Sequence, residues 1–310
     1  MTSAGRFAPS PSGDLHVGNL RTAILAWLFA RSTGRKFLLR VEDLDRARAG
    51  AEAGQLRDLE AIGVTWDGDV VRQTARGPYY AEAISRLQAA GLTYECFCTR
   101  REIQEAPSAP HAPQGAYPGT CRRLDPAELE FKRSTRPAAI RLRADVGQYT
   151  VRDLLHGTYT GVVDDFVLRR NDGVTAYNLA VVVDDAEQGI DQVVRGDDLL
   201  PSTPRQAFLA ALLDIPSPEY AHVPLVVNAD GVRLAKRDGA VTLRDLADAG
   251  SPAAAVRDRL LESLGLPAGP LEKALGAFGP STLPLGPWVW REMEVPAPEP
   301  RVHPDAGRHD

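Results

Sequence analysis

Apolar residues in the first 95 positions alternate between helical and strand-like spacing. Those at positions 20, 23, 24, 27 and 28 lie on one helix face and predict an amphipathic helix. The nearly continuous apolar run that follows, at 37–41, is typical of a buried parallel strand. Further helical patterns complete the alternation at 55–62 and 79–90. This order predicts an α/β fold with a doubly wound parallel sheet, whose first half we assign to residues 1–95.

The pattern changes at residue 96. Six prolines between residues 107 and 137 are expected to break helices, and short β-like runs occur at 139–142 and 161–168. We therefore predict an inserted domain, irregular or rich in β-structure, over residues 96–170. It carries 12 basic and 9 acidic side chains, and its paired arginines could meet a phosphate backbone or form a solvated surface.

Helix and strand patterns return after the insert and predict the second half of the sheet domain, residues 171–240. They lie at 177–186, 192–195, 204–213 and 223–228. Residues 241–278 show the apolar spacing of further short helices. Residues 279–310 hold 7 of the 24 prolines and little periodic apolar pattern, which predicts a disordered tail.

Composition narrows the class of protein. The 310 residues are 44% hydrophobic and 25% charged, with a net charge of −5, which argues against a protein that coats nucleic acid. No apolar run approaches the roughly 20 residues of a membrane helix, and no basic-then-apolar leader is present. We expect a cytoplasmic protein without a membrane partner. Three cysteines cannot all pair with one another, so metal binding is a better interpretation than disulfides.

Two loops carry candidate chemistry. The first lies between the first strand and the first helix, where His16 and Asn19 could donate to phosphate oxygens and Gly18 leaves room for a nucleotide. A polar loop in which Asn19 caps the helix fits equally well. The second loop contains Arg233 and Lys236, which could close over a triphosphate, although a plain surface loop is the alternative. Lysine is rare here, because 32 of the 36 basic residues are arginine.

Taken together, these two loops resemble the HIGH and KMSKS signatures of class I aminoacyl-tRNA synthetases in their glutamyl form. Three further motifs of that family have similar counterparts, in the same order, between them. The five segments are Pro9-Ser10-Pro11-Ser12-Gly13-Asp14-Leu15-His16-Val17-Gly18-Asn19, Leu39-Arg40-Val41-Glu42-Asp43-Leu44-Asp45, Tyr177-Asn178-Leu179-Ala180 with Asp184-Asp185, Val194-Arg195-Gly196-Asp197-Asp198, and Arg233-Leu234-Ala235-Lys236-Arg237.

The resemblance implies a Rossmann-like catalytic domain split by an acceptor-binding type of insert, followed at 241–278 by a stem-contact-like helical region. It implies L-glutamate and ATP with Mg²⁺ as substrates, and we expect a monomer. Glu42 would supply the anion for the glutamate ammonium, and arginines would grip its carboxylates. The implied glutamate-binding residues are Arg6, Phe7, Ala8, Pro9, Ser10, Glu42, Tyr177 and Arg195. The implied ATP-binding residues are His16, Gly18, Asn19, Arg233 and Lys236, with His16, Asn19 and Lys236 as catalytic residues.

The chain also departs from the family pattern. Only 73 residues follow Arg237, so we expect no anticodon-binding domain, and Val181 stands where the full-length enzymes are expected to have Asn. These departures imply a truncated member that attaches glutamate to the queuosine base at the wobble position of tRNA(Asp). The alternatives are a truncated synthetase that charges a tRNA 3′ end, and a non-catalytic tRNA-binding paralog. Nucleotidylyltransferases share adenylyl transfer but lack the glutamate-binding residues.

The cysteines predict a metal site in the insert. Cys96, Cys98 and Cys121 offer three soft ligands, and a closed tetrahedral zinc site needs a fourth. By general chemistry His111 is the first candidate, whereas the resemblance implies Tyr117. The zinc would be structural and remote from the reaction.

Overall fold

A mixed sheet of seven strands forms the centre of the protein. The computed structural model describes residues 3–45, 47–105, 117–234 and 241–291. The strand order is β3-β2-β1-β9-β10-β6-β7. Strands β3 to β6 of this order run parallel, as the apolar runs predict, and β7 pairs antiparallel with β6. The bounds are β1 Ala4–Phe7, β2 Lys36–Val41, β3 Val71–Arg72, β6 Gln148–Asp153, β7 Gly157–Val162, β9 Ile190–Gly196 and β10 Glu219–Val223.

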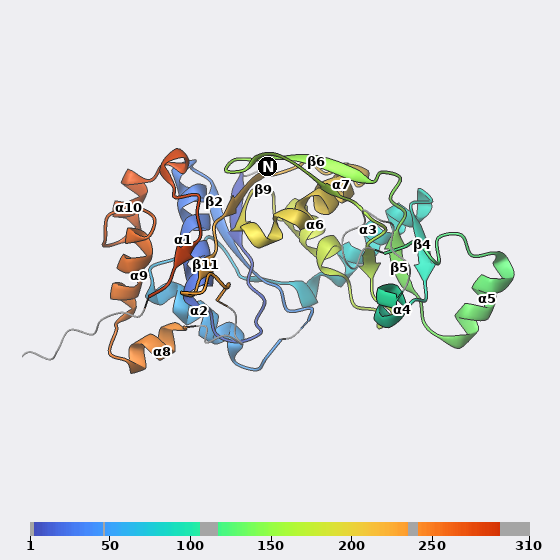
Figure 1. Cartoon of the computed structure of the whole chain (residues 1–310), viewed down its shortest axis with the longest axis horizontal. Helices are drawn as coiled ribbons and strands as arrows, with labels where there is room; N and C mark the ends of the chain where they lie inside the picture. Colours follow the sequence, from blue (N-terminus) through green and yellow to red (C-terminus); the bar gives the residue numbers. More distant parts are fainter. Residues whose placement is uncertain (1–2, 46, 106–116, 235–240, 292–310) are drawn as a thin grey trace, which may run out of the picture.

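Helix α1 (Val17–Ser32) lies where the apolar spacing predicts a helix, but it is buried nearly all round, so the prediction that it is amphipathic is wrong. One side packs on β1, β2 and β9, and the other is covered by α9 (Ala253–Glu262) and α10 (Leu271–Ala277) (Figure 1). Even Arg21 is buried within it, donating to the Ser263 hydroxyl at 3.0 Å and the Pro224 carbonyl at 2.9 Å. The C-terminal helices therefore remove the solvent-facing side that the spacing predicts.

Other helices cover the remaining parts of the sheet. Helices α3 (Gly77–Ala89), α6 (Tyr177–Glu187) and α7 (Thr203–Leu212) share a second hydrophobic core with β5 and β8 of the insert. The other elements of this region are α2 Ala51–Ala61, α8 Leu243–Asp248, and the 3-10 turns η1 Gln73–Arg76, η2 Asp197–Ser202 and η3 Pro280–Thr282. None of the helices in the described ranges is long and apolar enough to span a membrane.

The insert projects from the end of the molecule opposite α9 and α10 (Figure 1). It contains an antiparallel sheet of β4 (Thr93–Cys96), β5 (Ala139–Leu142) and β8 (Val167–Arg169), with helices α4 (Arg100–Glu105) and α5 (Pro126–Thr135). Two predictions are corrected here. Strands β6 and β7 lie within the predicted insert but extend the main sheet. Pro126 begins α5 instead of breaking a helix, because the first helical position has no N–H partner to lose.

Residues 279–291 are ordered, in contrast to the tail predicted from residue 279. Strand β12 (Trp288–Val289) pairs with β11 (Val226–Val227), and Leu283 and Trp290 are buried against the core around α1. The apolar run 223–228 is therefore not one strand, since it divides at Pro224 into β10 and β11. Residues 292–310 of the predicted tail lie outside the described residues.

Candidate active site

A cavity of about 620 Å³ opens at the carboxyl ends of β1, β2 and β9. From β1 the chain continues to β2 and β3 on one side, whereas the later strands β9 and β10 lie on the other side. Ligands of doubly wound sheets bind at the point where the strand order reverses in this way. Every residue predicted to bind glutamate or ATP that the structure describes lines this cavity. These are Arg6, Phe7, Ala8, Pro9, Ser10, His16, Gly18, Asn19, Glu42, Tyr177, Arg195 and Arg233.

His16 and Asn19 form a reciprocal cap at the start of α1. The His16 Nδ1 accepts the backbone N–H groups of Gly18 at 3.1 Å and Asn19 at 3.3 Å, while the Asn19 Oδ1 accepts the backbone N–H of His16 at 3.2 Å. Because Nδ1 is an acceptor, the neutral ring carries its hydrogen on Nε2. The cap therefore fixes the tautomer that can donate to a phosphate oxygen, and Asn19 is half of the cap instead of the cap itself.

The sequence suggests that Gly18 leaves room for a nucleotide, but the adjacent His16 ring already requires glycine at this position. A Cβ at this position would lie 2.9 Å from Cε1 and 3.0 Å from Nδ1 of the His16 ring. No Cβ fits at that separation without displacing the ring. Gly18 therefore permits the His16 cap, and with it the orientation of the ring.

The loop before α1 is held by Gln55, which lies outside the sequence motifs. Gln55 on α2 is buried and donates from Nε2 to the carbonyls of Ser10 at 3.0 Å and Gly13 at 2.7 Å. The Glu42 backbone N–H adds a bond of 3.0 Å to the Pro9 carbonyl. The role of Gln55 cannot be predicted from a sequence motif, because its partners are backbone atoms about 45 residues away.

Buried charges form the wall at the ends of β1 and β2. Asp185 accepts Arg40 Nη1 at 2.8 Å and Arg6 Nε at 3.2 Å, and Arg40 Nη2 lies 3.4 Å from the Glu42 carboxylate. Burial alone would raise the pKa of Asp185, but Arg6 and Arg40 outweigh it and the pKa is lowered. The pKa of Glu42 is raised, because the effect of its burial exceeds the opposite effect of the same two arginines. Glu42 is buried, not a surface carboxylate, and a ligand ammonium would stabilise its charged form.

Asp184, which precedes Asp185, connects the buried charges of the cavity wall to the second hydrophobic core. Its carboxylate is fully buried and accepts the Tyr80 hydroxyl and the Gln73 side-chain amide, each at 2.8 Å. Arg76 adds an ion pair and Arg40 approaches to 3.8 Å. The two aspartates after Tyr177 in the sequence therefore anchor arginines and helices, and do not themselves face the cavity as a catalytic pair.

Arg195 is held by β10 and α7 instead of by its sequence neighbours. It donates from Nε to His222 Nε2 at 3.0 Å and from Nη2 to the Thr203 hydroxyl at 2.8 Å. The nearby Asp198 pairs with Arg233 and not with Arg195 in the described structure. Arg195 is 5% exposed and is one of the residues that line the cavity.

The residues on either side of the segment that carries Lys236 contact the cavity wall and the start of α1. Leu234 lines the cavity and donates its N–H to the Val226 carbonyl at 3.2 Å. On the other side, the Val241 carbonyl accepts the N–H of Val17, the first residue of α1, at 3.0 Å. Lys236 and its neighbours, residues 235–240, lie outside the described residues.

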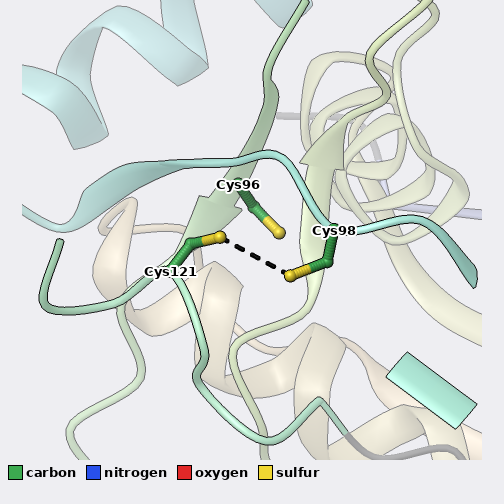
Figure 2. Close-up of side chains that lie close together, drawn as sticks. All are labelled: Cys96, Cys98 and Cys121. Atoms are coloured by element: carbon green, nitrogen blue, oxygen red, sulfur yellow. Dashed lines mark hydrogen bonds between the residues drawn. The ribbon is translucent and has the colours of Figure 1, made fainter. Parts of the chain in front are cut away.

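The three cysteines converge in the insert (Figure 2), and none of them lines the cavity. Their sulfurs lie within 4.8 Å of one another and could hold a metal ion. The Tyr117 hydroxyl is 3.4 Å from Cys96 Sγ and 3.7 Å from Cys98 Sγ, and Cys98 and Cys121 are 3.5 Å apart. Hydrogen bonding from Cys121 lowers the pKa of Cys96 to about 4, which favours a thiolate ligand. His111 lies outside the described residues.

Comparisons with known proteins identify the family of this fold. The model of the family described as tRNA synthetases class I (E and Q), catalytic domain, matches residues 4–274. The crystal structure of glutamate-tRNA synthetase from Elizabethkingia anophelis superposes with a TM-score of 0.79 at 26% identity, covering 94% of this chain and 68% of that chain. The fold and the match define the class of the protein as a class I tRNA synthetase.

Curated relatives define it further. The glutamyl-Q tRNA(Asp) synthetase of Nocardia farcinica is 65% identical over 287 residues, which are 92% of this chain and 92% of that protein. The protein of the same name from Cutibacterium acnes is 54% identical over 270 residues, 86% of this chain and 77% of that protein. The chain belongs to the glutamyl-Q tRNA(Asp) synthetase family.

The contribution of the His16 cap to stability can be measured separately from any role of His16 in binding. His16→Ala removes the acceptor for two backbone N–H groups and should lower the free energy of unfolding by about 1 kcal/mol. His16→Asn restores a capping oxygen and should recover most of that loss. Urea unfolding followed by circular dichroism checks both variants. Equal stabilities of the alanine and asparagine variants would contradict the capping role.

Proposed function

We propose that this enzyme activates L-glutamate with ATP and transfers the glutamyl group to the queuosine base at the wobble position of tRNA(Asp). The observation that carries the proposal is that one cavity is lined by two buried arginines, a buried carboxylate and the capped start of α1. The names of relatives at 65% and 54% identity support the acceptor. ATP and tRNA are cytoplasmic molecules, and we expect the enzyme there, as a monomer.

Glutamate needs one anionic and two cationic partners. Glu42 would bind the ammonium, since burial without a matching ligand cation raises its pKa. Arg6 and Arg195 would bind the carboxylates, because a guanidinium can donate two parallel hydrogen bonds to a carboxylate. The Tyr177 hydroxyl, the Ser10 side chain and the backbone of Phe7, Ala8 and Pro9 complete the proposed subsite.

ATP would bind at the start of α1, where helix N–H groups and the helix dipole favour phosphate. His16 Nε2 and the Asn19 amide would donate to phosphate oxygens, and Gly18 would lie beside the nucleotide. A glutamate α-carboxylate oxygen then attacks the α-phosphorus, and the bond to the bridging oxygen breaks to release pyrophosphate. Arg233 and Lys236 would neutralise charge on the phosphates, together with the Mg²⁺ that accompanies ATP.

In the second step, a hydroxyl oxygen of the queuosine base attacks the glutamyl carbonyl carbon. The acyl–phosphate bond breaks, AMP leaves with the bonding electrons, and the hydroxyl proton is lost. The same residues would serve both steps by positioning and charge stabilisation, with no covalent enzyme intermediate.

The metal centre would hold zinc. Three sulfurs that lie within 4.8 Å of one another suit its soft, tetrahedral coordination, and Tyr117 is the described side chain that contacts two of them. Cys96, Cys98, Cys121 and Tyr117 also form a small core with Phe97 and Leu124. Bound zinc would supply cross-linking of the insert, not chemistry.

Activation is tested by glutamate-dependent exchange of labelled pyrophosphate into ATP. Wild-type enzyme should exchange label, and Lys236→Ala should lower the rate about 100-fold or more while the KM for glutamate changes little. Lys273→Ala is the matched control, because Lys273 on α10 donates only to the Ala268 carbonyl at 3.0 Å among the described contacts. Equal rates in the parent and the Lys236 variant would contradict the role of Lys236, and absence of exchange in the parent would contradict activation itself.

The fourth metal ligand is tested by zinc affinity. Tyr117→Phe should weaken zinc binding about 10-fold or more, measured by competition with a chromophoric chelator. His111→Ala serves as the alternative-ligand variant and should bind zinc as the parent does. The reverse result would assign the fourth ligand to His111.

A further inference from the structure

A row of three buried polar side chains crosses the sheet beside the cavity. Arg195 on β9 and His222 on β10 are direct partners in the parallel register, and Asp153 ends β6, the next strand. Arg195 is 5% exposed, Asp153 2% and His222 0%. The row therefore leads from the proposed glutamate site to His222 and Asp153, which do not line the cavity.

The ring hydrogen of His222 can have one position. A guanidinium only donates, so the 3.0 Å contact from Arg195 Nε makes His222 Nε2 an acceptor. His222 Nδ1 must then carry the hydrogen, which it donates to Asp153 Oδ2 at 2.6 Å. The Thr203 hydroxyl bridges the pair, 2.8 Å from Arg195 Nη2 and 3.0 Å from His222 Nε2. His222 is consequently neutral and in a single tautomer.

Asp153 is fixed from every side. Its Oδ2 accepts the backbone N–H and the ring N–H of His222, and its Oδ1 accepts the N–H groups of Leu155 at 2.9 Å and His156 at 3.0 Å. Burial alone would raise the pKa of Asp153, but these hydrogen bonds outweigh it and the pKa is lowered. An ionised carboxylate with four donors provides a rigid anchor for the histidine.

Two of the five guanidinium hydrogens of Arg195 are used by His222 and Thr203 in the described structure. Arg195 also lines the cavity, so the plane of its guanidinium there is set by these two partners. A fork that binds a carboxylate through two hydrogen bonds depends on this orientation.

We propose that His222, whose tautomer Asp153 fixes, is a positioning residue that aims Arg195 at a carboxylate of glutamate. This inference rests on the proposed function for the identity of the ligand. It assigns to a buried histidine, outside every motif of the sequence analysis, a role in selecting a dicarboxylate amino acid.

Two substitutions separate positioning from mere structure. His222→Asn keeps a donor for Asp153 near the place of Nδ1 but removes the acceptor for Arg195. His222→Gln offers an oxygen near the place of Nε2 but removes the donor to Asp153. The asparagine variant should bind glutamate about 10- to 100-fold more weakly, whereas the glutamine variant should stay within about 3-fold of the parent. Stability should show the reverse order, with the glutamine variant the less stable.

Glutamate affinity by calorimetry, the KM values for glutamate and ATP in pyrophosphate exchange, and urea unfolding are measured together. The KM for ATP should change little in both variants, and His156→Gln, an exposed neighbour, should leave the affinity for glutamate unchanged. Glutamate affinity that follows stability in both variants, or loss of ATP and glutamate affinity to the same extent, would overturn the proposal. A parent that binds glutamate without exchange would overturn the proposed activation but not this inference, and a parent that does neither would overturn both.

The pH dependence has a defined sign. Burial, with Arg195 and His156, lowers the pKa of His222 from its usual 6.5, in spite of Asp153. Among the described residues, four charged or titratable groups face His222. Asp153 and Arg195 contact its ring nitrogens, the His156 ring contacts its backbone carbonyl, and the Tyr220 ring stacks with its own ring. As the pH falls below about 6.5, the unfolded chain takes up this proton before the folded protein does, so folding stability falls. His222→Gln should lack this component of the pH dependence, and an identical dependence in parent and variant would contradict the neutral assignment.

Discussion

The buried pairing of Arg6 and Arg40 with Asp185 is the interaction on which the site depends. Arg40 is fully buried, and burial alone would lower its pKa, but the carboxylates of Asp185, Glu42 and Asp184 outweigh this and raise it. Removing one partner from such a group commonly costs about 3–5 kcal/mol, because a charge is left buried and unpaired. The positions of Arg6 and Glu42 are consequently fixed before any ligand arrives. A rigid charged wall suits a reaction that relies on positioning.

Helix α1 connects the cavity to the C-terminal helices at the other end of the molecule. Its first residues form the His16 cap at the cavity, and its body is enclosed by the sheet and by α9 and α10. The segments that flank residues 235–240 contact the cavity wall and the start of the same helix. The C-terminal helices and the residues up to Trp290 therefore support the site through α1, although they lie outside the cavity.

Local patterns predicted much of this arrangement. The apolar run at 37–41 and the loop ending at Asn19 are properties of adjacent residues, and both lie where the sequence predicts. Partners distant in the chain were not predictable in this way. Gln55 contacts backbone atoms, His222 contacts a strand that the sequence assigned to the insert, and the burial of α1 depends on helices more than 200 residues away. The ordered segment at 279–291 escaped prediction because two tryptophans, not a periodic pattern, attach it to the core.

The central claim is that the activated glutamate goes to a base in the anticodon loop and not to a tRNA end. The most direct measurement is the incorporation of labelled glutamate, with Mg²⁺ and ATP, into tRNA(Asp) prepared with and without queuosine, beside tRNA(Glu). Label is expected on tRNA(Asp) that contains queuosine and on neither of the others. Label on tRNA(Glu), or on tRNA(Asp) regardless of queuosine, would contradict the claim.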